Sequence, residues 1–224
     1  MEEKEIKKLI LTGAEELGLS LTEEATKGFS LYLSELIKWG SQINLTSIRD
    51  AEETIKRHFL DSLTLLPFLE IKTTKPKRIL DIGTGAGLPG IPIKLASPSI
   101  ELVLLETSGK KANFLRHIIR VLDLKQVQVI KSRAEDPKTT AEFGAFFDIV
   151  TSRALTALPE FVVLARPYLA KGGKIIAMKG PINERLEEEL EAIKTTTKLA
   201  YKLHTIKPPF GQSATTIVIF DIFQ

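Results

Sequence analysis

Apolar residues follow a helical spacing through the first part of the chain. They recur every three or four positions over residues 3–18, 22–39 and 51–69, which is the repeat of one helix face. The spacing therefore predicts three amphipathic helices. A short polar stretch that contains a proline, residues 73–77, separates these helices from a different pattern.

Beyond this stretch, short apolar runs alternate with helical segments. Several runs are rich in isoleucine and valine, as expected of strands that are buried on both faces. The alternation predicts a parallel sheet with helices on both faces, because right-handed crossovers place them there. The predicted strands are 78–82, 101–106, 127–131, 147–152 and 174–179, and the predicted helices between them are 89–97, 109–123 and 155–170.

The end of the chain departs from this alternation. A predicted helix, 182–195, is followed by two strand-like runs, 198–206 and 214–222, with only KPPFGQS between them. So short a connection predicts an antiparallel hairpin. We therefore expect an α/β fold with a mainly parallel seven-stranded sheet, in which five parallel strands are finished by a reversed edge. The expected domains are an N-terminal helical subdomain, 1–72, and a sheet-containing domain, 73–224.

Composition narrows the class of protein but not its activity. The chain has 224 residues, of which 43% are hydrophobic and 26% charged, as in ordinary globular proteins. It contains no cysteine, which excludes disulfides, thiolate metal sites and cysteine nucleophiles. Because no apolar run resembles a signal peptide or a membrane span, we expect a cytoplasmic protein. A net charge of +3 permits a polyanionic partner without requiring one.

Two glycine patterns overlap in RILDIGTGAGLPG, residues 78–90. From Gly85 the stretch reads GAGLPG, the G-x-G-x-x-G pattern of a dinucleotide pocket. From Asp81 it reads DIGTGAG, an acid followed by G-x-G-x-G. In both cases the glycines let the backbone approach a ligand beyond the end of the first strand, but the two patterns imply different cofactors.

Carboxylates near the strand ends separate the two cofactors. Asp81 precedes the glycines, Glu106 ends the second strand and Glu135 follows the third. Three acids converging on one crevice suit S-adenosylmethionine, which carries a sulfonium and an ammonium but no phosphate, better than a pyrophosphate. Taken singly, Glu106 and Glu135 are explained equally well as solvated loop carboxylates; their position after consecutive strands favours a ligand site. A nicotinamide oxidoreductase that uses GAGLPG is the alternative enzyme class.

An ordered set of short motifs resembles one known family. The motifs are NLT (44–46), RHFLDS (57–62), DIGTGAGLPG (81–90), LLETSGKK (104–111), SRAED (132–136), SRA (152–154) and MKG (178–180). Together they closely resemble the RsmG family, also called glucose-inhibited division protein B, from about residue 20 to 222. The resemblance implies a Rossmann-like class I methyltransferase fold. It also implies transfer of a methyl group from S-adenosylmethionine to N7 of one guanine in bacterial 16S ribosomal RNA.

The resemblance also implies the cofactor-binding residues. It places them in the glycine loop and directly after the second, third and fourth strands. The pattern of an acid followed by glycines adds Asp81 and Gly85. The residues carried over from the family are Gly83, Leu88, Glu106, Thr107, Ser108, Ala134, Glu135 and Arg153.

The implied chemistry needs positioning more than proton transfer. Guanine N7 has a free lone pair, so no proton has to be removed before it attacks, and we expect no general base. The three histidines lack the spacing of a metal site, and we expect no metal. No catalytic residue is therefore assigned. The candidates for positioning the substrate are Arg57, His58, Arg153 and Lys179.

Each of these candidates also has an ordinary structural explanation. Arg57 and Asp61 are four residues apart, so they could pair on a helix surface, and His58 could cap or pack. Arg153 could form a structural salt bridge, and Lys179 could be a solvated strand end. With the resemblance, we expect this helix to close over the cofactor crevice and to present Arg57 to RNA.

The expected partner is 16S ribosomal RNA, either free or within a small-subunit particle, and the protein is expected to act as a monomer. Asn44 of the NLT loop is expected to join the helix over the crevice, and KPPF to form a rigid hairpin loop on the RNA side. A non-catalytic RNA-binding protein that keeps the cofactor as a structural ligand is a further alternative. Basic residues that could bind phosphates, or form a solvated helix face, are Lys110, Lys111, Arg116, His117 and Arg120, with Lys56 and Arg57 on the other side.

Overall fold

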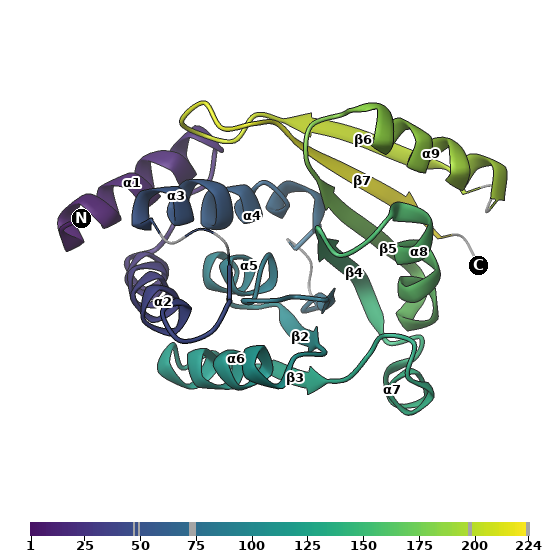
Figure 1. The fold of residues 1–224 in the computed structure, drawn as a ribbon, viewed down its shortest axis with the longest axis horizontal. Helices are drawn as coiled ribbons and strands as arrows, with labels where there is room; N and C mark the ends of the chain where they lie inside the picture. The colour runs from purple at the N-terminus through teal and green to yellow at the C-terminus, as the bar shows by residue number, and fades with distance from the viewer. Residues whose placement is uncertain (47, 49, 72–74, 197–198, 223–224) are drawn as a thin grey trace.

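The computed structural model describes residues 1–46, 48, 50–71, 75–196 and 199–222. Through this part of the chain runs one seven-stranded sheet with helices on both faces (Figure 1). The strands are β1 (Arg78–Ile82), β2 (Glu101–Glu106), β3 (Val127–Lys131), β4 (Phe147–Arg153), β5 (Leu169–Lys179), β6 (Tyr201–Ile206) and β7 (Thr215–Asp221).

The predicted parallel sheet with a C-terminal antiparallel hairpin is confirmed. The strand order is β3-β2-β1-β4-β5-β7-β6. Strands β1 to β5 pair in parallel, and β7 pairs antiparallel with both β5 and β6. The predicted run 198–206 began at a residue that lies outside the described part.

The expectation of a reversed edge is wrong in one respect. The reversed strand, β7, lies inside the sheet between β5 and β6, and the edge strand β6 runs in the same direction as β5. Burial explains this order, because β7 is buried along nearly its whole length whereas most of β6 is exposed. An apolar strand gains most from two neighbours, and a polar strand is suited to the edge.

The predicted helices are present, and one unpredicted helix joins them. The helices are α1 (Glu3–Glu16), α2 (Glu23–Gly40), α3 (Ala51–Thr54), α4 (Asp61–Leu63), α5 (Gly90–Ala96), α6 (Gly109–Val121), α7 (Pro137–Phe143), α8 (Leu158–Ala165) and α9 (Glu184–Thr196). Helix α7 is short and mostly polar, so it has no apolar repeat. Its start is marked by Asp136, whose side chain accepts from two backbone amides, and by Pro137 in the first turn.

The third predicted helix, 51–69, is composite. Between α3 and α4 the chain forms a π-helical segment, Ile55–Leu60, and it ends in a 3-10 turn, Leu66–Phe68. The segment buries Ile55, Phe59 and Leu60 and leaves Arg57 exposed. π-Helical turns are rare and are frequently found at functional sites.

Side chains alternate between two hydrophobic clusters on opposite faces of the sheet. On β1, Ile79 belongs to the cluster covered by α2, α5 and α6, and Leu80 belongs to the cluster covered by α8 and α9. This is the two-residue period of a strand that is buried on both faces. The first cluster also contains Ile10, Phe29 and Phe59 from the N-terminal helices, so these helices share one core with the sheet. The predicted domain boundary at 72/73 lies outside the described residues.

Candidate functional site

The glycine loop joins β1 to α5 at the carboxyl end of β1. Gly83 and Gly85 have φ values of +67° and +61°, in the left-handed region that favours glycine. A side chain at Gly83 would meet Leu155 of the β4–α8 loop, whose Cδ1 lies 2.3 Å from an ideal Cβ. A Cβ at Gly85 would meet little, its nearest neighbour being a backbone oxygen 4.0 Å away. Gly85 is therefore the position at which a ligand can approach the backbone of the loop.

Six backbone amides of this loop donate to acceptors within the protein. The amides of Gly83 and Thr84 both donate to the Leu105 carbonyl of β2, which ties the loop to the neighbouring strand. A pyrophosphate site needs free amides at this position. This arrangement argues against the dinucleotide alternative. Further donors are the amide of Gly85 to Glu106, those of Gly87 and Leu88 to the Thr84 carbonyl, and that of Gly90 to Asp81.

Asp81 lies beneath the loop and not on its surface. Its side chain is fully buried, and one oxygen, Oδ2, accepts from the Thr84 hydroxyl at 2.6 Å and the Gly90 amide at 2.9 Å. The other oxygen, Oδ1, has no hydrogen-bond partner among the described residues. Burial raises the pKa of Asp81 to about 7, against the effect of these two hydrogen bonds. Asp81 is therefore a residue that organises the loop, with one oxygen left for a donor.

Glu106 holds the position between the glycine loop and α6. Its carboxylate accepts from the amide of Gly85 at 2.9 Å through Oε2, and from the amide of Ser108 at 2.7 Å through Oε1. The side chain of Ser108 in turn caps α6, and Thr107 beside it is exposed. Oε1 also accepts from the Thr107 hydroxyl at 3.4 Å, so among the described residues the lone pair left for a ligand hydroxyl is on Oε2.

The two candidate residues after β3 differ in burial. Ala134 is buried, and its carbonyl accepts from the Tyr168 hydroxyl at 2.6 Å. Glu135 is exposed and lies 3.4 Å from the guanidinium of Arg133. The three acids expected at one crevice lie in three different environments. Asp81 is buried under the loop, Glu106 is bonded to backbone amides, and Glu135 faces solvent.

Tyr32 contributes to the structure of the glycine loop. No motif in the sequence had marked it as a functional residue. Its hydroxyl donates to the carbonyl of Ala86 in the glycine loop at 2.6 Å, and its ring stacks on Phe59 with centroids 5.0 Å apart. An aromatic residue at helical spacing is ordinarily interpreted as core. Helix α2 therefore supports the glycine loop directly, through a contact that links positions 54 residues apart.

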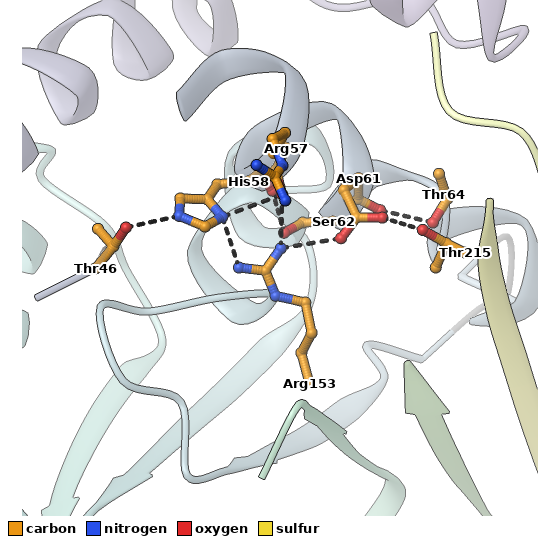
Figure 2. Close-up of polar contacts among 8 residues, drawn as sticks. All are labelled: Thr46, Arg57, His58, Asp61, Ser62, Thr64, Arg153 and Thr215. Atoms are coloured by element: carbon orange, nitrogen blue, oxygen red, sulfur yellow. Dashed lines mark hydrogen bonds and ion pairs between the residues drawn. The ribbon is translucent and has the colours of Figure 1, made fainter. Parts of the chain in front are cut away.

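All four candidate positioning residues line one cleft, and two of them, His58 and Arg153, also bond to each other in a side-chain cluster. Figure 2 shows the cluster that we call the Arg153 hub, made of Arg153, Asp61, His58, Thr46 and Thr215. One guanidinium nitrogen of Arg153, Nη1, lies 3.0 Å from Asp61 Oδ2 and donates to the Arg57 carbonyl. The other, Nη2, donates to His58 Nδ1 at 3.0 Å. The second oxygen of Asp61 accepts from Thr215 at the start of β7.

Nδ1 of His58 lies within hydrogen-bond distance of two groups. It is 3.0 Å from Nη2 of Arg153, which only donates, and 3.1 Å from the Arg57 carbonyl, which only accepts. Nε2 lies 2.8 Å from Thr46 Oγ1. Burial, followed by the charge of Arg153, lowers the pKa of His58 to about 4. His58 is thus a neutral structural link, which agrees with the packing explanation more than with a role in proton transfer.

The hub also decides between the alternatives for Arg57 and Arg153. Arg57 does not pair with Asp61; its guanidinium lies 3.9 Å from Glu53, and the side chain is 58% exposed. Arg153 forms the structural salt bridge with Asp61, in which both side chains are only 16% exposed. Arg57 is therefore the member of this helix that remains available to a partner.

Lys179 is not a solvated strand end. Its ammonium donates to the Thr156 carbonyl at 2.8 Å and lies 2.9 Å from Glu189 of α9. Glu189 also accepts from the amide of Leu158. These contacts hold the β4–α8 loop, the same loop that places Leu155 against Gly83. Lys179 therefore acts on the glycine loop only through its neighbours.

The basic helix face is divided between solvent and packing. Lys110, Arg116 and Arg120 are exposed on α6. His117 is instead bonded to Glu35 of α2, with its ring 5.1 Å from that of Trp39. Asn44 is exposed.

No helix in the described residues has the length and apolar content needed to cross a membrane, and the same residues contain no cluster suited to a metal ion.

The sheet order, the glycine loop and the acid after β2 define a Rossmann-like fold of the S-adenosylmethionine-dependent methyltransferase class. A methyltransferase of this class from Aquifex aeolicus superposes with a TM-score of 0.55 at 16% identity, covering 76% of this chain and 93% of that one. Fibrillarin from Aeropyrum pernix, solved with natively bound S-adenosyl-L-methionine, superposes with a TM-score of 0.52 at 14% identity, covering 72% and 76%. At these identities the likeness concerns the fold.

Sequence comparison identifies the family. The chain belongs to the GidB family, described as rRNA small subunit methyltransferase G, whose family model matches residues 25–216. A relative from Acetivibrio thermocellus named ribosomal RNA small subunit methyltransferase G is 33% identical, covering 100% of this chain and 92% of its own. A relative of the same name from Acinetobacter baumannii is 44% identical, covering 80% and 82%. The predicted resemblance is confirmed.

Proposed function

We propose that this protein transfers a methyl group from S-adenosylmethionine to N7 of a guanine in bacterial 16S ribosomal RNA. Membership of the GidB family and the names of its relatives support the small-subunit RNA as the substrate. The contact between Glu106 and the amide of Gly85 puts a carboxylate where the ribose diol of a nucleoside cofactor needs an acceptor. Because dinucleotide sites use an acid at the same place, membership of the methyltransferase family is the observation that favours S-adenosylmethionine.

The residues of the glycine loop fit S-adenosylmethionine in charge and in space. The unpartnered Oδ1 of Asp81 can accept from an ammonium group, and Gly85 leaves open space above the loop. Glu106 would bind the ribose hydroxyls. The residues proposed to hold the cofactor are Asp81, Gly83, Gly85, Leu88, Glu106, Thr107, Ser108, Ala134, Glu135 and Arg153. For Arg153 the proposed contribution is indirect, because its guanidinium is bonded within the hub.

The proposed reaction requires the protein mainly to orient the methyl donor and the acceptor base. When bound, S-adenosylmethionine supplies a methyl group activated by its sulfonium. Guanine N7 attacks with its own lone pair, so no side chain has to remove a proton first. His58, held neutral and bonded on both ring nitrogens, is consistent with a reaction that uses no general base. We propose that Arg57 contacts RNA, and that Lys179 and the hub position the loops around the reacting atoms. We also propose that the enzyme acts as a cytoplasmic monomer.

The deciding experiment follows the methyl group. Purified protein is incubated with tritiated S-adenosylmethionine and, in parallel, with ribosomal RNA and small subunits from a strain that lacks this gene. Borohydride and aniline then cleave the RNA at N7-methylguanosine. We expect label at one cleavable guanine, and the RNA form that accepts it identifies the substrate.

Other outcomes separate the alternatives. Bound cofactor with no label on either RNA would favour the non-catalytic RNA-binding protein. A fluorescence change with NADH, without binding of S-adenosylmethionine, would favour the oxidoreductase. Label at a position that aniline does not cleave would leave the donor in place and overturn N7 as the target atom.

A further inference from the structure

A cleft of about 530 Å³ lies beside the Arg153 hub, at the carboxyl ends of β4 and β5. This volume is within the range of small-molecule sites. Four segments line most of the cleft: the helical turn 56–61, residues 153–154 at the end of β4, residues 178–181 at the end of β5, and the loop between β6 and β7. None of these segments belongs to the glycine loop. The cleft is therefore a separate hollow that adjoins the proposed cofactor site through Arg153 and Ala154.

The β6–β7 loop is attached at both ends to the helical turn that carries Arg57. At one end Phe210 lies under the Lys56 ammonium, 5.5 Å from the ring centroid. At the other end Thr215 donates to Asp61 of the hub. Between these anchors Gln212 lines the cleft, and its side chain makes no hydrogen bond to the described residues. In Figure 1 this loop extends from the sheet toward α1. Anchoring at both ends presents the short stretch to the cleft in one arrangement.

The lining combines an apolar surface with an exposed cation. Pro181 is exposed and presents its ring, and Gly180 leaves space, because a Cβ there would meet nothing within 4 Å. Arg57 lies at the same cleft and is exposed, so its guanidinium can bind a phosphate. The carboxylate of Asp61 is already neutralised by Arg153. A ligand with a flat apolar face, polar edges and a phosphate matches this lining.

We infer that this cleft binds the acceptor nucleotide after it has turned out of the RNA, with Arg57 at its phosphate and Gln212 at an edge of its base. The inference rests on the proposed function and adds to it a base-binding subsite formed by the β6–β7 loop. A base inside a folded RNA cannot reach a buried reactive atom unless it leaves the stack, and such bases are held by flat contacts and edge hydrogen bonds. The β4–α8 loop, with Leu155 against Gly83, places the cleft next to the glycine loop.

The test fills the cleft and leaves the fold intact. Gly180→Leu puts a side chain into the open space of the cleft. The matched control is Gly40→Leu, at the end of α2, where a Cβ likewise meets nothing within 4 Å. We expect Gly180→Leu to lower kcat/KM for the RNA by about a hundredfold, as misplacement of a substrate can, with unchanged calorimetric affinity for S-adenosylmethionine. Gly40→Leu should behave as the wild type.

A second variant keeps the inference testable if Gly180→Leu does not fold. Gln212→Ala removes one side-chain amide from an exposed loop. It should lower kcat/KM for the RNA by about threefold to tenfold, the effect of one hydrogen bond, and again leave cofactor affinity unchanged.

Two results would overturn the inference. If Gly180→Leu lowers the affinity for S-adenosylmethionine as much as it lowers kcat/KM for the RNA, the cleft holds part of the cofactor. Unchanged RNA kinetics in both variants would mean that the nucleotide binds elsewhere. If the wild type itself transfers no methyl group, the proposed function fails, and RNA binding by Gly180→Leu and Gly40→Leu still decides the cleft. Weaker binding by Gly180→Leu alone then supports it, and equal binding overturns it.

Discussion

The glycine loop and the Arg153 hub lie next to each other, but they are held together by contacts of different range. In the glycine loop, Thr84 bonds to Asp81 three residues away, and Gly85 bonds to Glu106 at a separation of 21. In the hub, Arg153 bonds to Asp61 at a separation of 92, and Thr215 bonds to Asp61 at 154. Most hydrogen bonds of the loop fall within one β-α-β unit, with the Tyr32 hydroxyl as a contact from outside it, whereas the hub exists only once three distant segments have packed.

The two regions also differ in the groups that they use. The glycine loop is built largely from backbone amides, with Asp81 and Glu106 accepting from them. The hub is built from the ion pair of Arg153 and Asp61 and from neutral side chains that bond to it, and little hydrogen-bonding capacity is left free. A site of backbone groups and open space is suited to hold a ligand. A closed network of side chains is suited to hold segments in place, here the turn that carries Arg57.

The largest expected effect concerns the glycine loop. Gly83→Asp should abolish binding of S-adenosylmethionine, because the new side chain displaces Leu155 and adds a carboxylate beside Glu106. Isothermal calorimetry measures the affinity. Gly18→Asp is the matched control, since Gly18 has a similar φ of +69° with nothing within 4 Å of its Cβ. Retained binding in a folded Gly83→Asp protein would remove the glycine loop from the cofactor site.

The next effect is on stability and concerns the hub. Arg153→Met should reduce the free energy of unfolding by about 2 kcal/mol, because it leaves the half-buried Asp61 without its partner. Arg133→Met, which removes a solvent-exposed ion pair with Glu135, should change it by less than about 0.5 kcal/mol. Urea denaturation compares the two. Equal losses would mean that the hub adds nothing beyond a surface pair, and a cycle with Asp61→Asn measures the coupling.

The pH dependence of stability should differ in sign between the two regions. The raised pKa of Asp81, about 7 against 3.8, means that the native state keeps a proton that the unfolded chain releases. Its contribution to stability is therefore lost as pH rises from about 4 to 7. The lowered pKa of His58, about 4 against 6.5, means that the unfolded chain binds a proton that the native state does not. Its contribution is lost as pH falls from about 6.5 to 4.

Single variants separate these opposing contributions. Asp81→Asn should leave a free energy of unfolding that rises with pH across this window, by at most about 1.4 kcal/mol per pH unit. His58→Gln should leave a free energy of unfolding that falls as pH rises across the same window. Urea midpoints at several pH values between the two limits measure both slopes. Slopes of the same sign in the two variants would contradict the assigned environments.

The smallest expected effect concerns Arg57, the exposed residue beside the hub. Arg57→Ala should leave the affinity for S-adenosylmethionine unchanged and lower turnover on RNA. It should also reduce the slope of log affinity for RNA against log salt by about 1, the share of one phosphate contact. Turnover at several salt concentrations, with Lys110→Ala on α6 for comparison, provides the measurement. Unchanged turnover would remove Arg57 from the substrate site.

Most of the fold was predictable, because the periods of apolar residues report directly on local structure. The strands of the parallel sheet and the amphipathic helices α1 and α2 follow from that pattern. Helix α7 was missed because a short polar helix has no such period, although its cap at Asp136 is a recognisable signal. The place of β7 inside the sheet depends on burial, which is a property of the neighbours and not of the strand alone.

The fold class, the family and the glycine loop could be inferred from the amino-acid pattern alone, because they depend on spacings of a few residues. The packed structure was needed to show that Asp81 is buried under that loop, that Arg153 pairs with Asp61, and that Arg57 remains exposed. The physical reason is that a side chain's burial and partners are set by segments far away in the chain. Spacing along a sequence can bring two groups onto one face, but packing chooses which of them meet.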